Sequence, residues 1–274
     1  MSRDDRNGLA APMPAPLGGA AHRAVGLDIG ATKWFAIADG DASVFGRVHD
    51  DPARTLAEAL ERVGPFDRDA SLACSFAGVL DRDGTVDCWP NRPSWSGFRL
   101  AQELAVAGPV IIEDDGVCAA IGERVRGAAT DAESFCCITI GTGVGSGLFL
   151  EGRLRRPLAG RPAGIGHVRL GGGRPCRCSR TGCLQAELLE APDVDRGAAR
   201  FAEVVADLAV MLDLELIVLT GGRLVRDERL RKALVGALAA ELSELPCEVR
   251  VSPDPMRSAA YGARALAAGL EDGE

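Results

Sequence analysis

The chain has 274 residues, of which 47% are hydrophobic and 26% charged, a balance typical of a soluble globular protein with one large domain or two lobes. Its net charge of −8, without a long basic run, argues against binding to nucleic acid or to an anionic membrane. No apolar run approaches the ~20 residues that span a bilayer, and the N-terminus lacks the apolar core of a signal peptide.

The predicted elements begin after a leader, residues 1–23, whose Pro, Ala and Gly content predicts disorder. A strand, a glycine turn and a second strand follow at 24–39, then an amphipathic helix at 52–63 with Pro in its first turn. The remaining elements are expected in this order: a strand at 71–80, a turn-rich segment at 81–95, a helix at 98–106, a strand at 109–115, a helix at 116–127, a strand–turn–strand unit at 134–154, a helix at 197–213, a strand at 214–222, and helices at 226–243 and 256–269.

One theme occurs twice in this order. Residues 25–38 and 138–150 both read as β-hairpins whose turns combine Gly with Thr. Two similar lobes facing one cleft would follow, each presenting backbone N–H groups to the same ligand. Such an arrangement suits a polyphosphate.

The first of these turns is D-I-G-A-T, from Asp28 to Thr32. Gly30 allows close approach of the backbone to a phosphate, and Thr32 and Lys33 can donate hydrogen bonds. Asp28 can hold Mg²⁺ or one of its waters. The alternative is an ordinary hairpin turn.

The second turn is G-T-G-V-G-S-G, residues 141–147, with Gly141, Thr142 and Gly143 at its start. It does not open a helix, so the dinucleotide-binding fingerprint does not apply. The alternative is a flexible glycine loop, although the apolar runs on both sides argue against it. A later L-T-G-G ends a strand, and its Gly221 and Gly222 could lie against a nucleotide or form a plain turn.

Acidic residues gather where the strand at 109–115 meets a helix. Glu113, Asp114 and Asp115 follow two isoleucines. One of them could cap the helix. The functional alternative is a general base that accepts a hydroxyl proton during phosphoryl transfer, with a pKa raised by its acidic neighbours.

A metal site is predicted by the pattern H-x8-C-x-C-x4-C, formed by His167, Cys176, Cys178 and Cys183. Three thiolates and one imidazole make a closed tetrahedral zinc set, which is typical of a structural rather than a catalytic ion. The alternative is a loop that is merely rich in Cys. Nine Cys in the chain, three of them in this loop, indicate a reducing cytoplasm.

Together these motifs resemble the ROK family of sugar kinases and related repressors. The family's catalytic aspartate matches Asp115, its phosphate loops match Asp28, Gly30 and Thr32 and also Gly141, Thr142, Gly143 and Gly145, and its P-N substrate segment matches Asn91. The resemblance implies an α/β, two-lobed actin-like ATPase (ribonuclease H-like) fold with a structural zinc loop. We expect a first lobe at 24–115 and a second at 116–274, the latter carrying the zinc loop at 164–185.

Three positions that contact the sugar in the family differ here. Gly164 and Gln185 stand where the family has glutamates, and Asp114 stands where it has asparagine. A carboxylate at 114 favours a cationic group on the substrate, because an ammonium partner offsets the cost of a desolvated carboxylate. Kinases resembling this family phosphorylate kanosamine and C7-cyclitols in antibiotic pathways, so an amino sugar or a cyclitol is the expected substrate.

The predicted function is therefore an ATP- and Mg²⁺-dependent kinase acting on a hydroxyl, primary and 6-OH-like, of a hexose-like substrate in the cytoplasm. Asn91, Asp114, Gly164, His167 and Gln185 are expected at the substrate. The alternatives are a non-catalytic sugar-binding protein, a glucose or N-acetylhexosamine kinase, and a repressor, which the short, non-basic leader disfavours. The segment between Cys183 and Gly221 is shorter than is usual in the family, so a homodimer is left open.

Overall fold

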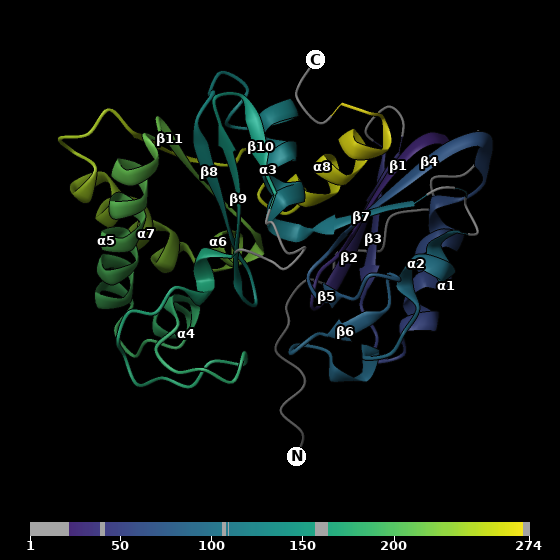
Figure 1. Ribbon diagram of the computed structural model, residues 1–274, viewed down its shortest axis with the longest axis horizontal. Coiled ribbons are helices and arrows are strands. Elements are labelled where there is room, and N and C mark those ends of the chain that lie inside the picture. The colour runs from purple at the N-terminus through teal and green to yellow at the C-terminus, as the bar shows by residue number, and fades with distance from the viewer. Residues whose placement is uncertain (1–21, 39–41, 106–107, 109, 157–163, 271–274) are drawn as a thin grey trace.

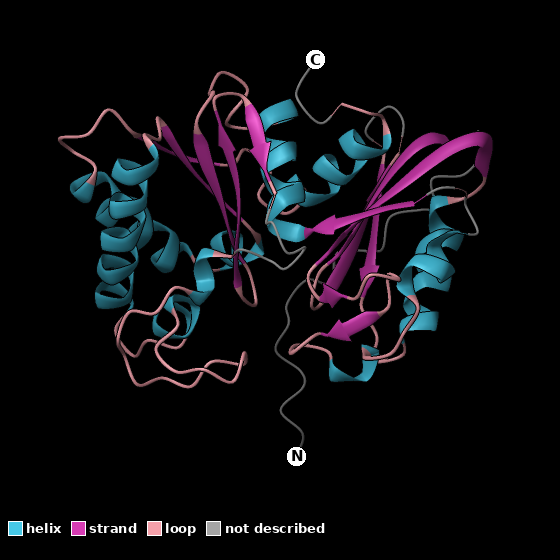
Figure 2. Cartoon of the chain, in the orientation of Figure 1, coloured by secondary structure: helices cyan, strands magenta, loops and turns pink. Residues whose placement is uncertain are grey.

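The computed structural model describes residues 22–270 apart from 39–41, 106–107, 109 and 157–163 (Figure 1). The predicted leader, residues 1–23, lies outside these residues except for its last two. Two five-stranded sheets stand side by side, with helices on their outer faces and a pair of helices between them (Figures 1 and 2). Among the described helices, none combines the length and the apolar character needed to cross a bilayer.

The first sheet has the order β3-β2-β1-β4-β7. β1 pairs with β2 antiparallel and with β4 parallel, β2 pairs with β3 antiparallel, and β4 pairs with β7 parallel. The strands are β1 (His22–Ile29), β2 (Lys33–Ile37), β3 (Ser43–Arg47), β4 (Phe66–Phe76) and β7 (Val110–Asp114), and the small β5 (Val79–Leu80) and β6 (Val86–Cys88) pair with each other.

The second sheet repeats that arrangement in the order β10-β9-β8-β11-β12. β8 again pairs antiparallel with the next strand and parallel with a later one, so the duplication predicted from the two hairpins is confirmed. Its strands are β8 (Phe135–Ile140), β9 (Val144–Leu150), β10 (Arg153–Arg155), β11 (Leu216–Thr220) and β12 (Glu248–Val251).

Helices cover both faces of the second sheet, and the strand sequences reflect this. On β8, Ile138 and Ile140 pack into one core while Phe135 and Cys137 pack into another, because successive side chains point to opposite faces. The core that contains Ile138 and Ile140 is completed by α5 (Val194–Leu212) and α7 (Glu228–Glu241) on the outer face of the sheet. The core that contains Phe135 and Cys137 is completed by α3 (Asp115–Arg126) and α8 (Ser258–Ala267) on the face toward the first sheet. The first sheet is covered on its outer face by α1 (Pro52–Val63) and α2 (Leu100–Leu104).

The two helices between the sheets, α3 and α8, cross so closely that their backbones are in contact. An added Cβ on Gly262 of α8 would lie 1.7 Å from the carbonyl oxygen of Cys118, and one on Gly122 of α3 would lie 2.0 Å from that of Ser258. Only glycine permits this approach. α8 also contacts β1 and β4, so the last helix of the chain joins the second sheet to the first. The predicted boundary between residues 115 and 116 remains a prediction.

Several short elements were not among those predicted. β3 and β12 are edge strands, and α4 (Leu184–Leu189) and α6 (Gly222–Arg226) are single-turn helices, all too short for a clear periodicity. The helix expected at 226–243 is α7, Glu228–Glu241. It starts two residues later than expected because Asp227 separates it from α6 and caps it by accepting a hydrogen bond from the N–H of Leu230 at 3.0 Å.

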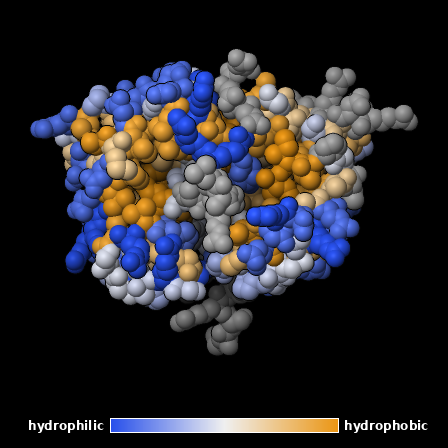
Figure 3. Space-filling view, viewed as in Figure 1, coloured by the Kyte–Doolittle hydropathy of each residue, from blue (hydrophilic) through white to orange (hydrophobic). Residues whose placement is uncertain are grey.

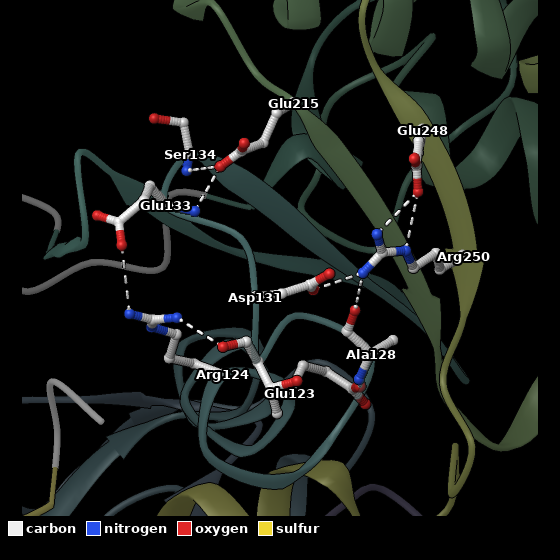
Figure 4. A network of polar contacts seen from close by, with 10 residues as sticks. Glu123, Arg124, Ala128, Asp131, Glu133, Ser134, Glu215, Glu248 and Arg250 are labelled. Carbon is white, nitrogen blue, oxygen red and sulfur yellow. Dashed lines mark hydrogen bonds and ion pairs between the residues drawn. The ribbon is translucent and has the colours of Figure 1, made fainter. Parts of the chain in front are cut away.

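A polar network closes the end of the second sheet remote from its hairpin turn (Figure 4). Arg250 on β12 contacts Asp131 at 2.6 Å and Glu248 at 2.8 Å, and Glu215 accepts a hydrogen bond from the N–H of Ser134 at 2.8 Å. These partners are largely exposed, so the network adds little to stability but fixes the connection between α3 and β8.

An aromatic cluster supports the segment that carries Asn91. Trp89 and Trp95 are buried and meet edge to face at 4.9 Å, and Phe76 of β4 packs against both. The indole N–H of Trp95 donates to the carbonyl of His49 at 2.9 Å. Both tryptophans therefore serve packing.

Candidate functional site

A cleft of about 500 Å³ lies between the two sheets, on the side of their hairpin turns. Hydrophobic residues come to the surface on either side of the middle of the face seen in Figure 3, and hydrophilic residues gather toward its rims. Every residue predicted to bind substrate or cofactor lines the cleft: Asp28, Gly30, Thr32, Lys33, Asn91, Asp114, Asp115, Gly141, Thr142, Gly143, Gly164, His167, Gln185, Gly221 and Gly222. Of the four predicted metal ligands, His167 and Cys178 also line it.

Asp28 enters the cleft from the end of β1. It is paired in register with Ser75 of β4, whose hydroxyl donates to Asp28 Oδ1 at 2.7 Å. Burial raises the pKa of Asp28 to about 7, against the opposing effect of the Ser75 hydrogen bond, and the nearby Asp115 adds to the increase. A bound cation would stabilise the ionised form of this buried carboxyl group, so Asp28 is suited to bind Mg²⁺.

Asp114 ends β7 and is the N-cap of α3. Its Oδ1 accepts hydrogen bonds from the N–H groups of Gly116 at 3.0 Å and Val117 at 3.3 Å. Burial raises the pKa of Asp114 to about 8, and Asp115 beside it adds to the increase. One carboxylate oxygen of Asp114 thus caps the helix, the alternative that the sequence left open for this acidic group. The residue still lines the cleft.

Asp115 is the first residue of α3, next to the second hairpin. An added Cβ on Gly145 would lie 3.4 Å from Asp115 Oδ1 and 2.7 Å from the Thr139 hydroxyl, so a glycine is needed for β9 to pass this close. Burial raises the pKa of Asp115, and hydrogen bonds with backbone N–H groups at the helix start oppose the increase. The carboxyl group therefore has the surroundings of a general base.

Two cations face the glycine turns. Burial lowers the pKa of Lys33 at the start of β2, and Arg226 at the end of α6 lowers it further, so the two positive charges lie within electrostatic range across the cleft. Arg226 was not predicted. In the sequence, only its position five residues after Gly221 could have pointed to it. The short helix α6 places it at the cleft.

The predicted metal ligands come together in one cluster. The ligand atoms of His167, Cys176, Cys178 and Cys183 lie within 4.8 Å of one another, and no other such group occurs among the described residues. Cys178 Sγ is 3.6 Å from Cys183 Sγ, and Cys176 Sγ is 3.9 Å from His167 Nδ1. A tetrahedral zinc with Zn–S bonds of 2.3 Å separates two sulfurs by about 3.8 Å, so the four residues fit such an ion.

Two of the ligands have the protonation tendencies that a metal site needs, whereas burial and the neighbouring thiols raise the pKa of Cys183 to about 12. Burial acts to raise the pKa of Cys178, but hydrogen bonds from Arg180 and from the neighbouring thiols lower it to about 7. Burial lowers the pKa of His167, and Arg180 lowers it further, which favours the neutral imidazole. Thiolate and neutral imidazole are the forms that bind zinc.

The loop around the cluster is held by Glu187 of α4. Its carboxylate accepts the N–H of Arg174 at 3.1 Å and lies 3.5 Å from the Arg174 side chain and 3.7 Å from that of Arg200. An added Cβ on Gly172 would meet this carboxylate at 2.0 Å. The loop is thus packed onto α4 rather than loosely attached.

Two contacts connect the loop to the rest of the cleft. Arg177, between two of the cysteines, donates to Asn91 Oδ1 and so joins the second half of the chain to the first. Gln185 accepts the N–H of Val144 at 3.2 Å and donates from Nε2 to Cys176 Sγ at 3.1 Å. Sequence reasoning missed both contacts.

Residues 24–192 match the ROK family. The chain belongs to this family. It is 37% identical over 182 residues to the kanosamine kinase of Amycolatopsis mediterranei, an alignment that covers 59% of this chain and 57% of that relative. The chain therefore aligns with little more than half of the length of this relative.

Solved structures of ROK proteins share the fold. The ROK hexokinase of Thermus thermophilus superposes with a TM-score of 0.71 at 27% identity, covering 89% of this chain and 97% of that one. A ROK family glucokinase from Streptomyces griseus, in complex with glucose and AMPPNP, gives a TM-score of 0.72 at 21% identity over 90% of this chain and 99% of that one. The predicted actin-like ATPase α/β fold, with its mixed sheets, is confirmed.

Proposed function

We propose that this ROK protein is a carbohydrate kinase that transfers the γ-phosphoryl group of ATP to a sugar hydroxyl. The observation that carries the proposal is the position of Asp115, at the start of a helix and between two Gly/Thr hairpins that line one cleft. The family membership and the names of the relatives support the same activity.

In this mechanism the chain positions the reactants and stabilises charge. Asp115 accepts the proton of the attacking hydroxyl, which we propose to be primary and 6-OH-like. Asp28 would hold Mg²⁺, which would supply positive charge to offset that of the phosphates, and the two hairpin turns that line the same cleft offer backbone N–H groups to them. Lys33 and Arg226 supply positive charge from opposite sides.

We further propose an amino sugar such as kanosamine, or a C7-cyclitol, as the substrate. The relative named a kanosamine kinase supports this choice, and so does a carboxyl group at 114 in the cleft. With a pKa of about 8, Asp114 carries a proton near neutral pH, and an ammonium group beside it would favour its ionised form.

A structural zinc ion at His167, Cys176, Cys178 and Cys183 is part of the proposal. When bound, zinc would fix the loop between Gly164 and Gln185 on one wall of the cleft. With Nδ1 directed at the cluster, the other ring nitrogen of His167 is left for a substrate hydroxyl.

The test is ADP release with Mg²⁺-ATP over a panel of glucose, N-acetylhexosamines, 3-amino-3-deoxyglucose and C7-cyclitols, beside Asp115→Asn. Turnover that the substitution abolishes establishes the kinase, and turnover confined to amino sugars or cyclitols supports the substrate proposal. Turnover of glucose, the ligand of the S. griseus structure, would retain the kinase and reject that substrate. No turnover by zinc-loaded protein, together with tight sugar binding, would contradict the kinase in favour of a non-catalytic sugar-binding protein.

A further inference from the structure

Gln185 lies where the metal cluster meets the second glycine turn. It is the second residue of α4, immediately after a helix start at which Cys183 is the N-cap. Its Oε1 accepts the N–H of Val144, and its Nε2 donates to Cys176 Sγ. A single side chain thus links a predicted metal ligand to the backbone of the hairpin 141–145, and both ends of its amide are used within the protein.

The orientation of this amide follows from its partners. A backbone N–H can only donate, so the carbonyl oxygen must face Val144. The amino group is then left for Cys176, and a metal-bound cysteine is a thiolate, which only accepts. A glutamate at this position, as the family has, could satisfy Val144 but would present a negative oxygen to the sulfur. Glutamine is therefore the residue that serves both neighbours.

The turn is built around this contact. An added Cβ on Gly143 would lie 3.1 Å from Gln185 Oε1, closer than most side chains tolerate, so the glycine leaves room for the amide. The turn is closed on its other side by hydrogen bonds from the N–H of Gly141 to the carbonyl of Gly143 at 2.9 Å and from the N–H of Gly145 to the Thr139 hydroxyl at 3.2 Å. Gln185 is the contact that extends out of the hairpin to the metal loop.

We propose that Gln185 is a positioning residue that couples occupancy of the metal site to the shape of the turn at 141–145, and thereby to nucleotide binding. The nucleotide part of this inference rests on the proposed function, because it takes the turn to hold phosphates. Coupling of this kind is reciprocal: zinc strengthens nucleotide binding by the same factor as the nucleotide strengthens zinc binding. Metal-ligand partners of this type typically change metal affinity 10- to 100-fold when replaced.

Two variants separate the ends of the bridge. Gln185→Glu keeps an acceptor for Val144 and loses the donor to Cys176, whereas Gln185→Met, of similar length, loses both. Gln102→Glu on the exposed surface of α2 adds the same charge away from the cleft and is the matched control. Circular dichroism of each variant establishes that it is folded.

The first readout needs no nucleotide. Zinc affinity is measured by competition with a chromophoric chelator. We expect Gln185→Met to bind zinc about 10- to 100-fold more weakly and Gln185→Glu, which restores the residue that the family has, to lose less, with Gln102→Glu unchanged. Equal zinc affinity in all four proteins would overturn the link between Gln185 and the metal.

The second readout is the dissociation constant of Mg²⁺-AMPPNP with and without zinc. We expect zinc to tighten binding to the wild type about fivefold or more, and to have less than a twofold effect in Gln185→Met. An equal effect of zinc on both proteins would overturn the coupling. Failure of zinc-loaded wild type to bind AMPPNP at all would instead reject the proposed function, while the chelator result for Gln185 would still stand.

If the metal-free protein does not stay folded, the test uses cobalt-loaded protein instead. The thiolate-to-cobalt absorption band is then followed during AMPPNP titration. A nucleotide-dependent change in wild type that is absent in Gln185→Met supports the coupling, and the same change in both contradicts it.

Discussion

The two hairpin turns occupy equivalent places in two sheets of the same order, yet they are supported in different ways. The first turn is held by its own half of the chain: Gly30 N–H donates to the carbonyl of Lys33 at 3.0 Å, and the Arg92 side chain donates to the carbonyl of Ala31 at 2.8 Å. The second turn depends on Gln185 and, through it, on the cysteine loop. Both turns have hydrogen bonds of their own, and the second is also tied to a cluster suited to a metal, so the two turns can be perturbed separately.

Loss of the proposed base should leave both turns intact and remove the chemistry. We expect Asp115→Asn to lower kcat by about 10²- to 10⁴-fold, the usual contribution of a general base. The dissociation constant of Mg²⁺-AMPPNP should stay within about threefold of wild type. A kcat within threefold of wild type would show that Asp115 is not the base.

Loss of one metal ligand should affect the second turn and spare the first. With free zinc at 100 times its dissociation constant, bound zinc stabilises the wild type by about 2.7 kcal/mol, and Cys183→Ser should lose most of this. The measurement is thermal unfolding with and without a chelator. The control is Cys88→Ser, an exposed cysteine outside the cluster. Equal responses of the two variants to the chelator would contradict a structural metal site.

Removal of the cation that faces Lys33 should weaken nucleotide binding modestly, because Arg226 is exposed. We expect Arg226→Ala to raise the dissociation constant of Mg²⁺-AMPPNP about fivefold, equivalent to about 1 kcal/mol, with a smaller effect at high salt. Arg229→Ala, an exposed residue of α7 paired with Asp195, is the control. An equal effect of the two substitutions would indicate general electrostatic attraction rather than a contact.

The smallest expected effect is on the pH dependence of stability and concerns Asp114, the N-cap of α3. The folded pKa of Asp114 is about 8, well above the ordinary value for an aspartate, so the folded state binds the proton more tightly than the unfolded chain. Its contribution to stability is complete below pH 4 and is lost as the pH rises to about 8. Asp28 and Asp115 act in the same direction, so only part of the slope belongs to Asp114.

Asp114→Asn keeps a good capping side chain and should flatten this part of the pH dependence of unfolding. The control is Asp193→Asn, an exposed N-cap that likewise accepts two backbone N–H groups. An unchanged slope in Asp114→Asn would show that the raised pKa does not contribute to stability.

Local patterns in the sequence predicted what depends on neighbours along the chain. The four metal ligands lie within one short stretch, and their spacing alone predicted the site. Asp115 was one of three carboxylates at the end of a strand, and the resemblance to the family singled it out. The repeated Gly/Thr turns likewise indicated two matching sheets. The edge strands β3 and β12 gave too few residues for a pattern.

Contacts between distant segments could not be predicted in this way. The bond from Gln185 to Val144 spans 41 residues and that from Arg177 to Asn91 spans 86, and neither follows from any local periodicity. Asp114 shows a different limit: its sequence allowed a cap or a substrate contact, and the capping bonds became visible only with the backbone of α3 in place. Its contact with a substrate remains a prediction.

The glycine crossing of α3 and α8 restricts how the cleft can close. With backbone atoms of the two helices in contact at Gly122 and Gly262, sliding one helix along the other would drive carbonyl groups into each other. A rotation about the crossing point avoids this collision, so we expect the cleft to close by rotation of the two sheets about the crossing of α3 and α8. Tolerance of mutation should follow the same geometry: even alanine at Gly262 should force the two helices apart.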